Sequence, residues 1–404
     1  MKRFAVFLPL LLLYLLLVLL LQDPILTGDE PRYLGYAQNI LQGFFTTREE
    51  LLFWSGPGYP LLLTPFVLLG IPLLAAKLLN AIMLFLAVGL FDRALLLYVP
   101  ERTALVWAYV FGLYWPLYTG LAVLVTEVLS TLLVCMFLYS FCRAQRLPER
   151  RLFYSVAAGV SLGYLALTKI FFGYVIASCL ILFSFGYLWR RRAHLRRSAA
   201  VCLVAMALCS PYLLYTYHMT GRVFYWGNSG GLSLYWMSDG ELGDWHSEAD
   251  VLGSDNFGSE TKAFFNNIAD LDYVRKDDAL KRQAIVNIRE HPMVFAENWI
   301  ANVGRMLFSY PYSFTPQKIT TLFYMVPAMF VVVIAVLFIY PSILARSIIP
   351  AEIVDALLLG GVALGGSSLL SAYPRHFYLL LPIFGIWIVF VATKVLSIQI
   401  QKRG

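Results

Sequence analysis

Apolar residues occur along this chain in long blocks that short polar segments separate. The first block, residues 4–21, is long enough to cross the roughly 30 Å hydrocarbon core of a bilayer as a helix. Nine further blocks of similar character follow it. The pattern therefore predicts an all-α polytopic membrane protein with about ten transmembrane helices. The other helices are expected at residues 72–98, 104–118, 121–141, 153–167, 171–188, 199–217, 321–340, 349–370 and 377–391.

Two short amphipathic helices are expected in the first polar interval, residues 22–71. Pro31 suits the first turn of a helix, because its missing N–H would be unpaired there. Apolar residues then recur at helical spacing, and Gly43 offers a C-terminal stop. The second short helix is expected at residues 59–70. Both are predicted to lie on the membrane surface, as part of a first outer loop.

A single long polar segment, residues 218–318, interrupts the later apolar blocks. It contains 13 of the 24 acidic residues and nine basic ones, so its net charge is −4. One amphipathic helix is expected after Asp278 and a second from residue 293, with His291-Pro292 as the break between them. The chain is thus predicted to have three parts. These are an N-terminal transmembrane catalytic module (1–217), a large outer loop (218–318) and C-terminal transmembrane helices (319–404).

Three tryptophans of the large loop, Trp226, Trp236 and Trp245, are interleaved with glycines and acidic residues. Such a mixture suits stacking on sugar rings. Ordinary packing inside a small domain is the alternative.

The composition supports a membrane protein, since 60% of the residues are hydrophobic and 14% are charged. The net charge of +7 does not indicate a nucleic-acid partner, because the basic clusters at residues 2–3, 143–151, 190–197 and 394–403 each flank an apolar block. This positive-inside pattern places those clusters in the cytoplasm and residues 218–318 outside. The five cysteines lie in or beside apolar blocks without a Cys-x-x-Cys pair, so neither a disulfide framework nor a metal site is expected.

Candidate chemistry gathers on the outer side of the predicted bundle. Asp29 and Glu30 stand at the start of the first amphipathic helix, where a carboxylate pair could accept a proton or hold a cation, or could simply cap the helix. Glu127 is expected about two turns into the fourth span, facing a polar cavity or a structural hydrogen-bond partner. Lys169 and Arg375 lie at outer turns. A lone lysine there either binds a ligand or extends its amine towards the interface.

Taken together, these features resemble the GT-C glycosyltransferases that use lipid-phosphate-linked sugars. The closest likeness is to the bacterial protein O-mannosyltransferase-like branch, which includes aminoarabinose transferases and lipopolysaccharide-core transferases. The likeness covers nearly the whole chain, although two motif prolines and an appended soluble domain are missing. The matching motifs are Asp29-Glu30-x-x-Tyr33, Gly56-Pro57-Gly58-Tyr59-Pro60, Lys77-Leu78-Leu79-Asn80, Glu127, Leu167-Thr168-Lys169, the glycine-bearing stretch 220–236, His291-Pro292 and Arg375-His376 with Pro382.

The resemblance implies inverting transfer of a sugar from a polyprenyl-phosphate donor to a glycan, lipid or protein acceptor, at the outer face of the inner (plasma) membrane. It implies Asp29 as the catalytic base and Glu30 as its partner in orienting the acceptor. The donor phosphate would bind Arg32, Lys169 and Arg375. Supporting roles would fall to the remaining matched side chains, Tyr33, Tyr59, Lys77, Glu127 and His376.

No cofactor is firmly implied, although two carboxylates also suit a divalent cation. The competing hypotheses are a transporter or lipid-linked-glycan flippase, and a ligase-like or polymerase-like enzyme. Transporters usually carry internal repeats with Gly/Pro-broken helices in matching halves. No such repeat is found here, and the charged residues gather at one face rather than at mid-membrane. A ligase-like enzyme would place its key arginines and histidine in a late outer loop, without an early Asp-Glu pair.

Overall fold

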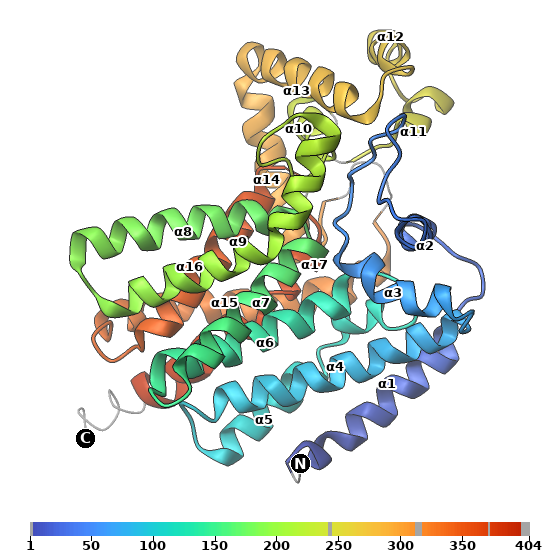
Figure 1. Ribbon diagram of the computed structural model, residues 1–404. Helices are drawn as coiled ribbons and strands as arrows, with labels where there is room; N and C mark the ends of the chain where they lie inside the picture. Colours follow the sequence, from blue (N-terminus) through green and yellow to red (C-terminus); the bar gives the residue numbers. More distant parts are fainter. Residues whose placement is uncertain (1–2, 241–244, 312–316, 371, 397–404) are drawn as a thin grey trace.

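The computed structural model describes residues 3–240, 245–311, 317–370 and 372–396. All regular structure in these ranges is helical, and the helices form one bundle that a further group of helices covers at one end (Figure 1). The bundle consists of α1 (Leu8–Leu21), α4 (Leu73–Leu95), α5 (Glu101–Gly112), α6 (Glu127–Arg146), α7 (Arg151–Thr168), α8 (Phe171–Arg190), α9 (Ala193–Thr220), α15 (Leu322–Leu344), α16 (Ala351–Ser368) and α18 (Leu381–Phe390).

Each predicted apolar block has a helical counterpart. Eight of the helical segments in the described ranges are long and apolar enough to cross a membrane. The other two blocks differ from the prediction in length. The block at 104–118 ends its α-helix at Gly112, because the backbone turns extended at Tyr114 and Pro116 follows, and a 3-10 turn (Trp115–Gly120) completes it. The last block is divided between a short helix, α17 (Pro374–Tyr378), and α18.

The centre of the bundle is α6, which packs against α4 and α7. Of its most apolar 18-residue window, 78% is buried inside the protein, whereas only 11% of the corresponding window of α15 is buried. An apolar helix with so little protein around it faces lipid. The polar groups that α6 carries are therefore surrounded by protein, as buried ionisable groups in a membrane require.

The two short helices of the first outer loop form as predicted, but the second is apolar rather than amphipathic. Helix α2 (Glu30–Leu41) ends before Gly43, and α3 (Gly58–Leu68) ends before Gly70. Both glycines adopt positive φ angles, +88° and +61°, that favour glycine at a helix end. The two helices pack against each other above the bundle.

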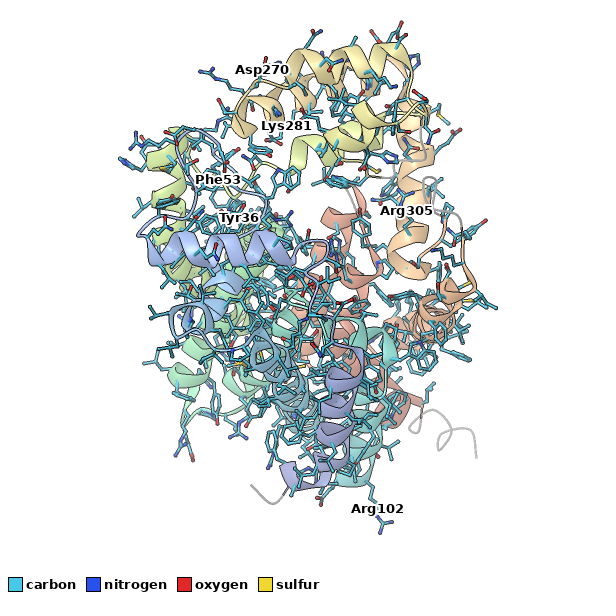
Figure 2. The ribbon with its side chains drawn as sticks, turned by 90° about the vertical axis from the view of Figure 1, so that its right-hand side faces the viewer. Tyr36, Phe53, Arg102, Asp270, Lys281 and Arg305 are labelled. Atoms are coloured by element: carbon cyan, nitrogen blue, oxygen red, sulfur yellow. The ribbon has the colours of Figure 1, made fainter. Side chains whose placement is uncertain are left out.

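The long polar segment folds into a helical layer that lies at the top of Figure 1. Its helices are α10 (Gly230–Ser238), α11 (Glu248–Gly253), α12 (Ser259–Ile268), α13 (Tyr273–Glu290) and α14 (Pro292–Phe308). Helix α13 begins earlier than predicted, because Asp272 caps it by accepting hydrogen bonds from the N–H groups of Val274 and Arg275. Figure 2 shows Asp270 and Lys281 of this layer at the end of the molecule opposite Arg102.

Two of the three loop tryptophans pack inside the protein. Trp226 is fully buried against Gly173 of α8, where an added Cβ would lie 2.1 Å from the indole. Trp236 is 1% exposed and stacks in the core of the outer layer, beside Phe265. The sugar-stacking expectation is therefore wrong for Trp226 and Trp236, whose ring faces are taken by protein. Trp245 is only partly buried.

Candidate functional site

A cavity of about 520 Å³ lies between the top of the bundle and the outer layer. Its wall includes the start of α2, the turn between α7 and α8, and α16 with the start of α17. The first outer loop and α10 close the other side. Segments far apart in the sequence thus contribute to one hollow, as the outer-face grouping of charged residues predicted.

Asp29 lies at the mouth of this cavity, immediately before α2. Its backbone is already helical, and its side chain makes no capping hydrogen bond, so capping does not explain this carboxylate. One carboxylate oxygen lies 2.8 Å from the guanidinium of Arg32, and the other lies 4.0 Å from that of Arg375. The side chain is 32% exposed, which leaves it accessible from the cavity.

Glu127 lies deeper, and the structure corrects its predicted place in the helix. It is the first residue of α6 rather than two turns inside a span, because residues 121–126 are not helical. Its Oε1 atom accepts a hydrogen bond from Lys169 Nζ at 3.1 Å and lies 3.6 Å from Nη1 of Arg375. Its Oε2 atom is buried without a hydrogen-bond partner. Glu127 therefore holds two cations together beside the cavity through one oxygen, and its other oxygen is buried.

Lys169 follows the last residue of α7 and is held by the first outer loop. An added Cβ at Gly56 would lie 2.0 Å from the carbonyl oxygen of Leu167, and one at Gly58 would lie 2.5 Å from Oγ1 of Thr168. The Gly-Pro-Gly stretch therefore packs directly on the turn that carries Lys169. The side chain of Lys169 is only 9% exposed and is paired with Glu127, so the interfacial-lysine alternative is wrong.

Glu30 and Lys77 do not line the cavity. Glu30 is 1% exposed, and its two oxygens accept hydrogen bonds from the N–H groups of Leu124 (2.8 Å) and Thr27 (2.9 Å). Lys77 donates to the carbonyl of Asp23 at 2.7 Å and lies 4.0 Å from Glu30. Both residues join the first outer loop to the bundle, and Glu30 also holds the segment before Glu127.

Asn80, from the same motif as Lys77, also holds the segment that precedes Glu127. Its side-chain amide lies 2.9–3.2 Å from the carbonyl oxygens of Gly120, Leu121 and Val123. These carbonyls precede α6, so the position of Glu127 depends on a buried asparagine one helix away.

Arg375 and His376 enter the cavity from the start of α17. Burial lowers the pKa of Arg375, but the carboxylates of Glu127 and Asp29 raise it more, so the net shift is upward. Burial and the positive charges of Lys169 and Arg375 hold the pKa of His376 well below its usual value of 6.5. Arg375 is therefore a permanent cation, and His376 is neutral at pH 7.

Aromatic rings border the Asp29 side of the cavity. The guanidinium of Arg32 lies 5.7 Å from the ring centre of Tyr33 and 5.5 Å from that of Trp54. Tyr33 lines the cavity and packs edge-on against the buried ring of Tyr59, whose centre is 5.2 Å away. Tyr59 does not itself line the cavity, so its place is behind Tyr33.

The structure thus gathers Asp29, Arg32, Tyr33, Lys169, Arg375 and His376 around one cavity, with Glu127 directly behind two of them. Sequence reasoning gave no site role to Trp54, Ser55, Thr126 or Thr168, which also line it. Trp54, Ser55 and Thr168 lie within or beside motifs that the sequence did show. Thr126 adjoins Glu127, but no pattern distinguished it.

Among the described residues, no group of three or more metal-ligating side chains is close enough to hold an ion. The nearest carboxylates, Asp29 and Glu127, are each paired with cations, and Arg375 lies between them. The residues present bind an anion more readily than a divalent cation.

No protein-family model and no curated protein sequence matches the chain. Among solved structures, it is similar to the oligosaccharyltransferase of Archaeoglobus fulgidus, tethered with an acceptor peptide containing the NVT sequon. The TM-score is 0.50 and the identity 16%, over 98% of this chain and 50% of that one. ArnT from Cupriavidus metallidurans, bound to undecaprenyl phosphate, is also similar, with a TM-score of 0.44, 16% identity, and 98% and 78% of the two chains covered.

The likeness to the archaeal structure concerns the fold, since the identity is low and this chain spans half of that protein's length. Together with the apolar helices, it defines the class: an all-α, multi-pass membrane protein with the GT-C fold. The fold predicted from the sequence is therefore confirmed.

Proposed function

We propose that this protein is a membrane glycosyltransferase that moves a sugar from a polyprenyl-phosphate-linked donor to an acceptor at the outer face of the membrane. The observation that carries the proposal is one cavity whose wall brings Asp29 and Arg32 together with Lys169 and Arg375. Three cations and two carboxylates give this cluster a formal charge of +1, which favours an anionic ligand. The fold supports the proposal, since a protein described as an oligosaccharyltransferase shares it.

In the proposed reaction, Lys169 and Arg375 bind the donor phosphate, and Arg32 contributes from the rim. Asp29 accepts the proton of the acceptor hydroxyl as the hydroxyl oxygen attacks the anomeric carbon. The bond between that carbon and the phosphate oxygen breaks, and the polyprenyl phosphate leaves with both electrons of the bond. Cations already held in place stabilise the charge that develops on the phosphate, without reorganisation during the step. Attack opposite the leaving group inverts the anomeric configuration.

Glu127 has a different role in this scheme. Because its carboxylate contacts both Lys169 and Arg375, it keeps these two cations together before the donor binds. Glu30 and Lys77 are assigned positioning roles, since neither reaches the cavity. Tyr59 supports Tyr33 from behind, and neutral His376 adds no positive charge to the phosphate site.

The transport and flippase hypotheses have less support from the site. The charged residues lie at helix ends, before α2, at the first residue of α6 and after α7, rather than at the middle of the spans. Substrate sites of transporters usually lie near the bilayer midplane.

The test is the variant Asp29→Asn, with turnover of a polyprenyl-phosphate sugar as the measurement. Asparagine keeps the size of the side chain and removes the proton acceptor, so activity should fall by about 10²–10⁴. Folding should change little, because the aspartate caps no helix. Glu127→Gln is the matched variant. If Asp29→Asn kept the native rate and Glu127→Gln lost it, Glu127 would be the base and the assignment of Asp29 would be wrong.

A further inference from the structure

A second cavity, of about 440 Å³, lies in the outer layer. It is enclosed by α10, α11, α12 and α13, and Trp54 of the first outer loop closes it on the side of the bundle. Its volume falls within the range of about 300–1,000 Å³ that is usual for small-molecule sites. Nothing in the proposed reaction so far uses this space.

Trp54 belongs to the walls of both cavities. Its ring centre lies 6.1 Å from that of Trp245, which lines the first cavity, and 5.8 Å from that of Tyr273, which lines the second. The interplanar angles are 83° and 74°, so the three rings form a row of edge-on contacts. A molecule bound in the second cavity is therefore separated from the Asp29 site by one side chain.

The polar groups of the second cavity are few and defined. Lys276 Nζ donates to Glu248 Oε2 at 2.8 Å, and Asp277 is buried and accepts the N–H of Gly231 at 2.5 Å. The ammonium of Lys276 has three donors and the carboxylate of Glu248 has four acceptor positions, so this ion pair can form further hydrogen bonds with hydroxyl groups. The remaining wall is largely apolar or aromatic, including Leu232 and Phe265.

The charge differs from that of the first cavity. Glu248 is paired with Lys276 and the buried Asp277 with Lys281, so these four groups carry no net charge. A phosphate therefore finds no excess positive charge here, whereas the cluster at the first cavity carries +1. The second cavity therefore favours a ligand without negative charge, with hydroxyl groups for the ion pair and a C–H face for the aromatic rings.

We propose that the second cavity binds an uncharged sugar ring of the acceptor, so that the acceptor is a glycan whose reactive hydroxyl extends past Trp54 towards Asp29. A cation lies over each aromatic ring, Arg32 at 5.5 Å from the centre of Trp54 and Lys276 at 5.6 Å from that of Tyr273. The axial C–H groups of the sugar pack against the opposite sides of these two rings. Glu248 and Lys276 hydrogen-bond its hydroxyl groups. Naming the sugar as the acceptor rests on the proposed function; the binding of a sugar in this cavity does not.

Hydrogen–deuterium exchange of the full chain in detergent tests the binding. The probes are the methyl glycosides of glucose, galactose and mannose at millimolar concentration, with glucose 6-phosphate and a serine-containing peptide as comparisons. At least one neutral glycoside should slow exchange in α11 and α13, and the comparisons should not. If no glycoside protects these helices, or if the phosphate or the peptide protects them instead, the inference is wrong.

Variants of Tyr273 give the second measurement. Tyr273→Ala should weaken binding of the protecting glycoside by about tenfold, whereas Tyr273→Phe, which keeps the ring, should bind nearly as the native protein does. Lys262→Ala is the matched control, since Lys262 pairs with Asp255 in the same layer and does not line the cavity. Equal binding by Tyr273→Ala and Tyr273→Phe would overturn the role of the ring.

Transfer of the donor sugar to water, measured without any acceptor, reports on the first cavity separately. Protection by a glycoside in a protein that turns over no polyprenyl-phosphate sugar would leave a sugar site and overturn the proposed function. Donor turnover without protection by any glycoside would support the proposed function and overturn the sugar site in the second cavity.

Discussion

At the scale of single residues, the first cavity is arranged around Arg375. Its guanidinium lies 3.6 Å from an oxygen of Glu127 and 4.0 Å from an oxygen of Asp29, so it connects the deep carboxylate to the accessible one. Lys169 reaches the same oxygen of Glu127, at 3.1 Å. A phosphate that enters this cluster can replace part of Glu127's interaction with both cations, which makes these two cations the main expected contacts of the donor.

We expect Lys169→Ala and Arg375→Ala each to weaken donor binding. Loss of one charge-assisted hydrogen bond typically costs about 1.5–3 kcal/mol, which corresponds to about a tenfold to 150-fold change in affinity. Titration of a fluorescent polyprenyl-phosphate sugar measures this change. Arg102→Ala is the control, since Arg102 lies at the far end of the molecule (Figure 2). Native affinity in both variants, together with a lower unfolding temperature, would show that the two cations serve stability alone.

His376 should make the stability of the protein depend on pH. Its pKa in the folded protein is depressed below 6.5 by burial and by the neighbouring cations, so the unfolded chain binds the proton more readily. The contribution to stability is then complete above the unfolded pKa of 6.5 and is lost as the pH falls below it, at about 1.4 kcal/mol per pH unit. Thermal unfolding at pH 7.5 and 5.5 measures the loss.

His376→Gln is the matched variant for that experiment, because glutamine does not titrate. Its unfolding temperature should fall less between the two pH values than that of the native protein. An identical fall in both proteins would mean that other groups cause the pH dependence.

At the scale of secondary-structure elements, the site depends on where α6, α7 and α2 begin or end. Helix α6 begins at Glu127 because Asn80 and Glu30 hold the preceding segment in a non-helical conformation. Helix α7 ends at Thr168, and the Gly-Pro-Gly stretch packs against that end. These contacts bring Asp29, Glu127 and Lys169 together, while the hydrogen bonds to the backbone are made by Glu30 and Asn80.

The Gly-Pro-Gly stretch can be tested directly. Gly56→Ala places a methyl group 2.0 Å from the backbone oxygen of Leu167, which requires a movement of the loop or of the helix end. We expect a loss of about 1–3 kcal/mol in stability, typical of overpacking, and reduced donor turnover because Lys169 moves with the helix end. Thermal unfolding and donor turnover are the two measurements.

Gly35→Ala is the control for this variant. Gly35 lies inside α2 with nothing within 4 Å of an added Cβ, so alanine should stabilise the helix by about 0.5–1 kcal/mol and leave turnover unchanged. If Gly56→Ala behaved like Gly35→Ala, the close approach of the loop to α7 would have no functional role.

At the scale of the whole molecule, the outer layer and the two cavities lie at one end of the bundle. The turns between α6 and α7 and between α8 and α9 carry the arginine-rich clusters. Because such clusters remain on the cytoplasmic side, the outer layer should face the opposite compartment.

Reporter fusions test this orientation. Alkaline phosphatase inserted after Gly253, at the end of α11, should be active, because that enzyme folds only outside the cytoplasm. The same reporter inserted after Pro148, between α6 and α7, should be inactive. The reverse pattern would place both cavities in the cytoplasm and contradict an outward-facing site.

Much of the candidate site could be predicted from the sequence, because charged residues stand out against apolar spans. Asp29, Lys169 and Arg375 are conspicuous for this reason, and all three line one cavity. Glu30 is equally conspicuous in the sequence but points into the protein. Adjacent residues at a helix start project in different directions, and only the surrounding contacts decide which one faces the cavity.

The sequence by itself determined the helical, membrane-spanning fold and its two surface helices, because long apolar runs have no other stable conformation in a bilayer. It could not determine the depth of Glu127, the burial of Trp226 and Trp236, or the second cavity. Each of these depends on contacts between residues distant in the chain, such as Asn80 with Gly120 and Trp54 with Tyr273. Helix formation is decided by local composition and the solvent, whereas a cavity is the space left when several elements pack, and only the tertiary structure decides that.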